Sequence, residues 1–281
     1  IGQPDLPTPQ AAIDAIRNID RKVLEYSPSA GNRSYREKLV GYYAKFNINL
    51  TADDIIITSG GSEAVLFSFL SCLNPGDEII VPEPAYANYM AFAISAGAKI
   101  RTIATTIEEG FSLPKVEKFE ELINERTKAI LICNPNNPTS SAISTADMKK
   151  LLTVCRSLGI FVMIDETYIE FAPEGTSLSA VSLVPEFDNF MVIRGVSKFF
   201  AAPGLRFGYG LTSNQAFLQT LLTHQNPWSL NSIGAYAGER MLKDTDYIQK
   251  TWSLIDSERT RMCTELSGLD TVKIYPAYAN F

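Results

Sequence analysis

The sequence predicts an α/β fold: a mostly parallel, seven-stranded sheet flanked by helices, followed by part of a smaller α/β domain. Short apolar runs rich in β-branched residues alternate with helical patterns along the 281 residues. Several of these runs are continuously apolar, which is typical of strands covered on both faces. The seven expected strands are 55–58, 78–81, 99–103, 128–133, 160–164, 190–193 and 207–211.

The helical patterns between the strands have recognisable boundaries. A hydroxyl or carboxylate side chain commonly caps the first turn of a helix, proline fits its first position, and glycine often follows its end. The starts predicted in this way are Thr8-Pro9, Ser34-x-x-Glu37 and Ser144-x-x-Asp147, and Gly159 should end the helix that begins near Ala146.

The last part of the chain is expected to begin a second domain. Residues 244–266 have the pattern of one long helix, and residues 271–275 are expected to form a strand. We therefore expect a large domain over residues 24–243. Residues 1–23 and 244–281 should belong to a partial small domain.

The composition excludes several classes of function. A net charge of −6 gives no electrostatic footprint for nucleic acid or for an anionic membrane. With no apolar run of transmembrane length, no secretory signal and four cysteines without metal-ligand spacing, we expect a cytoplasmic protein with reduced, buried thiols and no metal. His224 is the single histidine, so proton transfer must fall to Lys, Tyr, Asp or Glu.

The most informative residue is Lys198, which lies between an apolar run and a stretch rich in glycine and proline. A lysine amine condenses with an aldehyde, and its pKa falls readily in apolar or cationic surroundings. Arg206 follows eight residues later, and its planar fork suits a phosphate, with Ser197 as a possible second donor. Together they suggest a Schiff-base lysine and pyridoxal phosphate as cofactor. The alternatives are a surface lysine and a surface ion pair.

A second candidate site is the turn at residues 58–65. A strand ends there, Gly60 and Gly61 turn the chain, and a helix begins with Ser62 near its start. Backbone N–H groups and the helix dipole favour a phosphate at such a place. A plain turn between strand and helix, capped by the serine, is an equally good interpretation of this segment alone.

Asp165 and Tyr168 follow the expected strand 160–164. Ligands of open α/β sheets bind at the carboxyl ends of strands. A carboxylate in that place can keep a pyridine nitrogen protonated, which makes the ring an electron sink, and the tyrosine can donate to the ring oxygen. The competing interpretation of Asp165 is a helix N-cap.

Two more strand ends carry polar or aromatic groups. Asn137 lies in the rigid segment Asn-Pro-Asn-Asn-Pro-Thr (134–139) and could donate to the same ring oxygen. Tyr86 lies in the segment 82–89 and could stack on a flat cofactor. A rigid turn and a core aromatic are the respective alternatives.

Taken together, these motifs resemble the fold-type I pyridoxal-phosphate enzymes, specifically the class I/II aminotransferases related to aspartate and histidinol-phosphate aminotransferases. The resemblance covers nearly the whole chain. It implies that Lys198 forms the Schiff base and shuttles the substrate α-proton. It also implies that Asp165 pairs with the pyridine nitrogen and that Tyr168 and Asn137 contact the ring oxygen. Tyr86 would stack on the ring. The implied phosphate ligands are Gly61, Ser62, Ser197 and Arg206.

The resemblance also implies a homodimer with shared active sites, because Tyr26 matches a tyrosine that reaches the phosphate of the neighbouring subunit. It suggests cis bonds at Glu83-Pro84 and Asn137-Pro138. There are two departures. Gly195 stands where relatives often carry Ser or Thr, so one phosphate hydroxyl is expected to be missing. The sequence given also ends at Phe281, before the position of the arginine that binds the substrate α-carboxylate in relatives.

The expected function is therefore a ping-pong exchange of an amino group between an L-amino acid and a 2-oxo acid such as 2-oxoglutarate. The donor is expected to be aspartate-like or another common amino acid. A decarboxylase or a β/γ-lyase on the same fold would share every cofactor residue. A non-catalytic sensor that binds pyridoxal phosphate is a third possibility, but the chain has no basic DNA-binding segment to favour it.

Overall fold

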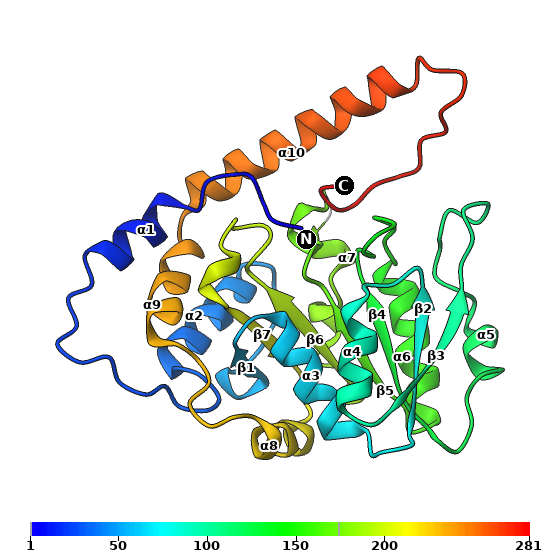
Figure 1. Cartoon of the computed structure of the whole chain (residues 1–281), viewed down its shortest axis with the longest axis horizontal. Coiled ribbons are helices and arrows are strands. Elements are labelled where there is room, and N and C mark those ends of the chain that lie inside the picture. The colour runs from blue at the N-terminus through cyan, green and yellow to red at the C-terminus, as the bar shows by residue number, and fades with distance from the viewer. Residues whose placement is uncertain (1, 174) are drawn as a thin grey trace.

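Seven strands form a single sheet in the computed structural model, which describes residues 2–173 and 175–281 (Figure 1). The sheet order is β1-β7-β6-β5-β4-β2-β3. The strands are β1 Ile55–Thr58, β2 Glu78–Glu83, β3 Lys99–Ala104, β4 Thr127–Cys133, β5 Phe161–Asp165, β6 Phe190–Gly195 and β7 Gly208–Leu211. Only β7 runs antiparallel to its neighbours β1 and β6. The predicted strands and the mostly parallel sheet are confirmed, with strand ends shifted by at most two residues.

Helices cover both faces of this sheet and extend beyond it. They are α1 Gln10–Arg17, α2 Arg33–Ala44, α3 Gly61–Cys72, α4 Asn88–Ser95, α5 Val116–Glu120, α6 Thr145–Ser157, α7 Gly175–Leu178, α8 Gln215–His224, α9 Ser232–Met241 and α10 Thr245–Leu266. The long helix α10 and the segment after it lie along one side of the molecule, and the two ends of the chain lie close together (Figure 1).

The continuously apolar strands follow from this two-sided cover. Successive strand side chains point to opposite faces, so a strand with helices on both sides needs apolar residues at every position. In β1, Ile55 and Ile57 join the core under α2, α6 and α9, whereas Ile56 joins the core under α3, α4 and α8. The same alternation separates Ile80 from Ile79 and Val81 in β2. Both cores are fully buried at these strands.

The predicted helix boundaries are partly confirmed. The Ser144 hydroxyl caps α6 by accepting from the Asp147 N–H, and Gly159 follows the end of that helix with φ +67°. The prediction for Ser34 is wrong, because α2 begins at Arg33 and the Ser34 hydroxyl donates to Glu239 instead. The prediction at the first helix is wrong by one position. Pro9 precedes α1, and the Thr8 hydroxyl donates to the Ala201 carbonyl rather than capping the helix.

The long helix predicted from residue 244 is confirmed as α10, but the strand expected at residues 271–275 is not formed. A strand exists only where a partner supplies a hydrogen-bonded ladder. In the described part of the chain the seven strands pair with one another, and residues 271–275 form an irregular segment that follows α10 (Figure 1). Apolar pattern alone therefore overstated the local structure here.

Three smaller expectations can be compared with the structure. The peptide bonds Glu83-Pro84 and Asn137-Pro138 are cis as expected, and Asn134-Pro135 is cis as well. All four cysteines are free thiols; two of them are buried and two are half-buried. Among the described residues, no helix has the length and apolar character needed to cross a membrane.

Candidate active site

The sheet topology brings the sequence motifs to one edge. Strands β2, β4, β5 and β6 are parallel, and β1 runs in the same direction because β7 is antiparallel to both of its neighbours. The carboxyl ends of these five strands therefore share an edge, together with the start of β7. Every predicted motif from residue 58 to residue 206 follows one of these ends or precedes β7.

A cavity of about 770 Å³ opens at this edge. Nine of the ten predicted site residues line it: Gly61, Ser62, Tyr86, Asn137, Asp165, Tyr168, Ser197, Lys198 and Arg206. The segments that carry them are far apart in the sequence, so the fold has to assemble them.

Lys198 follows β6 and is half-buried in this cavity. Its Nζ donates to the carbonyl oxygen of Gly2 at 2.6 Å. Burial lowers the pKa of the Lys198 amine, and the positive charge of Arg206 lowers it further. A lowered pKa increases the fraction of neutral amine, which is the form that attacks an aldehyde.

One end of the cavity has the donors that a phosphate needs. The first turn of α3 begins at Gly61, with Ser62 as its second residue, and Ser197 and Arg206 face the same cavity. Gly60 has φ +84°, and a Cβ there would lie 2.7 Å from Arg206 Nη2. The missing side chain thus lets the Arg206 guanidinium approach the helix start, where main-chain N–H groups and the dipole favour an anion.

Asp165 also lines the cavity and accepts three hydrogen bonds. The Tyr89 hydroxyl donates to Oδ2 at 2.8 Å, and the N–H and hydroxyl of Thr167 donate to Oδ1 at 3.0 and 2.6 Å. Asp165 is only 8% exposed. Three donors suit an ionised carboxylate, which can only accept.

Tyr168, Asn137 and Tyr86 complete the lining. Burial is the main cause that raises the pKa of Tyr168, to about 12, so its hydroxyl stays protonated and can donate near neutral pH. The Asn137 side chain is half-buried, and the Tyr86 ring is exposed at the cavity mouth. Tyr86 packs edge-to-face on Tyr89, with ring centroids 5.5 Å apart.

Tyr26 lies away from this cavity. It is 81% exposed, and its ring packs against Trp228 in a shallow hollow lined by residues of both segments. Tyr26 is therefore the one predicted site residue that does not line the cavity of its own chain.

Sequence reasoning missed four residues that touch the predicted ones. Tyr89 and Thr167 bind Asp165, Gly2 binds Lys198, and Phe281 packs edge-to-face on Tyr168 with ring centroids 5.0 Å apart. A signal existed for Thr167, because an Asp side chain often accepts from the main chain two residues later. Phe281 and Gly2 come from the ends of the chain and had no local signal.

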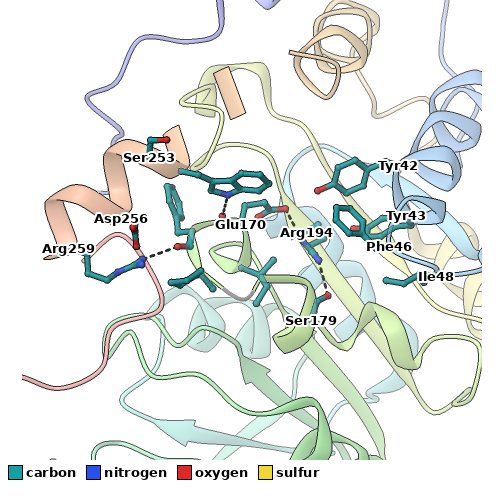
Figure 2. A pocket seen from close by; sticks show the side chains of 15 residues that line it. Tyr42, Tyr43, Phe46, Ile48, Glu170, Ser179, Arg194, Ser253, Asp256 and Arg259 are labelled. Atoms are coloured by element: carbon teal, nitrogen blue, oxygen red, sulfur yellow. Dashed lines mark hydrogen bonds and ion pairs between the residues drawn. The ribbon is translucent and has the colours of Figure 1, made fainter. Parts of the chain in front are cut away.

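A second cavity, of about 470 Å³, lies between α2, the segment after β5 and α10 (Figure 2). Beside it, Arg194 on β6 is paired with two carboxylates, Glu170 at 2.6 Å and Glu166 at 3.0 Å, and it also donates to the Ser179 hydroxyl. Glu166 and Arg194 are almost fully buried. Because its guanidinium is bound in this cluster, Arg194 does not contribute to the first cavity, although Arg194 precedes Lys198 by only four residues.

The residues at the first cavity fit pyridoxal phosphate. Gly61, Ser62, Ser197 and Arg206, which lie around Gly60 and are called the anion cradle here, match the phosphate of one flat molecule. The amine of Lys198 matches its aldehyde, and the carboxylate of Asp165 matches its ring nitrogen. Among the described residues, no cluster of three or more His, Cys, Asp or Glu could hold a metal ion.

Comparisons with known proteins agree with this geometry. The family model "Aminotransferase class I and II" matches residues 1–281. A histidinol-phosphate aminotransferase of Caldanaerobacter subterraneus is 30% identical over 275 residues, or 97% of this chain and 74% of that protein. A threonine-phosphate decarboxylase of Salmonella typhimurium is 30% identical over 226 residues, or 80% of this chain and 61% of that protein.

Comparison with solved structures indicates the same family. The structure of a single mutant of Thermus thermophilus aspartate aminotransferase superposes with a TM-score of 0.89 at 26% identity, covering 99% of this chain and 74% of that chain. Because the family model spans all 281 residues, this chain belongs to the class I and II aminotransferases, a family of fold-type I, pyridoxal-phosphate-dependent transaminases.

Proposed function

We propose that this chain binds pyridoxal phosphate at the first cavity and transfers an amino group from an L-amino acid to a 2-oxo acid in a ping-pong reaction. The observation that carries the proposal is the convergence of Lys198, Asp165 and the anion cradle at one cavity. Each group alone has an ordinary structural explanation, but together they match the three reactive parts of one cofactor.

The side chains have distinct roles in this proposal. Gly61, Ser62, Ser197 and Arg206 bind the phosphate, and Asp165 binds the ring nitrogen. Tyr168 and Asn137 donate to the ring oxygen, and Tyr86 packs against the ring face. When bound, pyridoxal phosphate supplies an electron sink for negative charge on the substrate α-carbon.

Lys198 has two roles. Its amine would hold the cofactor aldehyde between turnovers. Once free, Nζ would take the proton from the substrate α-carbon and deliver it to the carbon that receives the amino nitrogen. Burial and Arg206 lower the pKa of Lys198, so the neutral amine needed for proton acceptance is available nearer neutral pH.

The substrate is the least constrained part of the proposal. We propose aspartate or another common amino acid as donor and 2-oxoglutarate as acceptor. Relatives of this chain include histidinol-phosphate aminotransferases and an aspartate aminotransferase of Thermotoga maritima. Histidinol phosphate therefore belongs among the donors to be tested.

A half-reaction screen tests the reaction class. The full-length holoenzyme is mixed with each candidate donor, without acceptor, and 2-oxo product, CO₂ and ammonia are measured. We expect one carbonyl product per active site, a 2-oxo acid from an amino acid or an imidazolyl ketone from histidinol phosphate, and no CO₂ or ammonia. Addition of 2-oxoglutarate should then restore the original cofactor form. Release of CO₂ or ammonia as the stoichiometric product would contradict transamination.

Decarboxylation is the second candidate, because threonine-phosphate decarboxylases are also among the relatives. The cofactor residues serve both reactions equally, so the cavity lining alone does not distinguish them. The same screen decides between them when threonine phosphate is included: CO₂ without a 2-oxo acid would favour the decarboxylase.

We further propose that the chain acts as a homodimer in which Tyr26 reaches the phosphate of the partner subunit, and that residues 24–243 form the cofactor domain. The exposed position of Tyr26 supports the first part.

Subunit mixing tests the shared site. A Tyr26→Ala dimer and a Lys198→Ala dimer should each be impaired. A mixed dimer places the intact Tyr26 of one subunit beside the intact Lys198 of the other, so mixing should restore activity to about half of the wild-type value per dimer. Equal amounts of Lys198→Ala and Tyr26→Ala/Lys198→Ala protein serve as the control, which should stay inactive. No recovery in proven mixed dimers would refute a shared site.

A further inference from the structure

The Asp165 carboxylate is held from both sides by residues that the cofactor does not touch in the proposal above. Tyr89, at the start of α4, donates to Oδ2 at 2.8 Å. Thr167 donates twice to Oδ1, through its N–H at 3.0 Å and its hydroxyl at 2.6 Å. The hydroxyl contact is the shortest of the three, as expected for an O–H donor to a charged oxygen.

The Thr167 side chain lies beside two glycines. A Cβ on Gly195 would lie 3.4 Å from Thr167 Oγ1 and 3.5 Å from its Cγ2, and a Cβ on Gly61 would lie 3.4 Å from the same Oγ1. These are ordinary contact distances, so a methyl group fits at either position. A longer side chain on residue 195 would have to share the space that Thr167 occupies.

Gly195 has no side chain, and the Thr167 hydroxyl lies beside that position. That hydroxyl has one proton, and it donates the proton to Asp165. The Thr167 hydroxyl therefore holds Asp165 rather than serving as a further donor to the phosphate, although it also lies beside Gly61.

The cysteine and tyrosine side chains that face Asp165 are protonated near neutral pH, and the basic side chains Lys198 and Arg206 line the same cavity. Burial raises the pKa of Cys133 to about 12, and it raises the pKa values of Tyr89 and Tyr86 as well. Tyr168 is also protonated near neutral pH. Tyr89 and Thr167 thus act as donors, and the Asp165 carboxylate is the acceptor.

We propose that Thr167 is a positioning residue that holds the Asp165 carboxylate in the orientation that pairs with the cofactor ring nitrogen, with Gly195 leaving the room for it. The inference rests on the proposed function, because it needs pyridoxal phosphate in this cavity. It predicts that the hydroxyl of residue 167, and not its methyl group, matters for cofactor binding.

The test compares Thr167→Val, which keeps the shape and removes the hydroxyl, with Thr167→Ser, which keeps the hydroxyl. Pyridoxal phosphate affinity of the apo-protein is measured by quenching of tryptophan fluorescence. A hydrogen bond to a charged group corresponds to ~10- to 100-fold in affinity, so we expect that loss for Val and less than about threefold for Ser. Equal affinities of Val and wild type, or equal losses for Val and Ser, would overturn the proposal.

A spectroscopic readout separates positioning from a general structural effect. A protonated ring nitrogen withdraws electrons and lowers the pKa of the nitrogen that joins Lys198 to the cofactor. In Thr167→Val the visible absorbance of the bound cofactor should therefore change at a higher pH than in wild type, and Thr167→Ser should restore the wild-type profile. An unchanged profile in Thr167→Val would also overturn the proposal.

A pair of variants at the neighbouring glycine gives an independent measurement that does not alter Thr167. Gly195→Ala should retain near wild-type affinity, because a Cβ there makes ordinary contacts. Gly195→Val should displace the Thr167 side chain and reproduce the loss seen in Thr167→Val. If Thr167→Val does not fold, this pair of variants tests the proposal instead. Equal affinity for pyridoxal phosphate in Gly195→Val and Gly195→Ala would then contradict it. Failure of wild type to bind the cofactor at all would instead refute the proposed function.

Discussion

Replacing Lys198 with alanine should lower the rate of the amino-group exchange by about 10⁴-fold, the upper end of what a positioned proton-transfer group contributes. The variant loses both the amine that holds the cofactor aldehyde and the base that moves the α-proton. Asp165 and the phosphate ligands remain, so the variant should still bind pyridoxal phosphate non-covalently. The rate is measured in single-turnover experiments with a donor that reacts with wild type.

Two control variants make this prediction specific. Lys198→Arg keeps a positive charge but cannot hold an aldehyde, so it should be as inactive as alanine. Lys150→Ala removes an exposed lysine on α6 that pairs with Asp147 on the surface, and it should behave as wild type. Residual activity of Lys198→Ala within about tenfold of wild type would show that another residue moves the proton.

The second large effect is expected on stability. Replacing Arg194 with methionine should lower the free energy of unfolding by about 3–5 kcal/mol, because it leaves two carboxylates without their cation. The side chains of Glu166 and Arg194 are 0% and 6% exposed, and Glu170 is 18% exposed. Figure 2 shows Arg194 bonded to Glu170 and Ser179. Chemical denaturation measures the change.

The pH dependence of the Arg194→Met variant follows from the same contacts. Burial raises the pKa of the Glu166 carboxyl, and Arg194 lowers it, so removing Arg194 raises this pKa further. A carboxyl with a higher pKa in the folded than in the unfolded state binds protons more tightly when folded. The stability deficit should therefore shrink as the pH falls from neutral to mildly acidic values.

An exposed arginine provides the control for this charge change. Arg156 lies 3.8 Å from Asp188 on the surface, and Arg156→Met should change stability by less than about 1 kcal/mol. A similar loss in both variants would show that the buried cluster is not the cause, and a deficit in Arg194→Met that grows with falling pH would contradict the assigned charges.

Much of the site could be predicted from the sequence because each residue immediately follows a strand or precedes one. Parallel strands place such residues at one edge, so Asp165, Asn137 and Lys198 meet without any knowledge of side-chain packing. The strand positions could be predicted from the sequence equally well, because burial on both faces leaves continuous apolar runs.

The remaining contacts depend on packing in three dimensions. Tyr89 reaches Asp165 from another element, and the Thr167 side chain lies beside two glycines from other segments. The wrong strand at residues 271–275 has the same origin, since a pattern cannot show whether a partner strand is present. The role proposed for Tyr26 depends on a second subunit, which no single sequence segment describes.

The most direct test of the central claim is to locate the lysine that holds the cofactor. Full-length protein with bound pyridoxal phosphate is reduced with borohydride, which makes the bond between lysine and cofactor permanent, and the labelled peptide is identified by mass spectrometry. The proposed site predicts one label per chain, on Lys198. A stoichiometric label on another lysine, or no label in protein saturated with the cofactor, would contradict it.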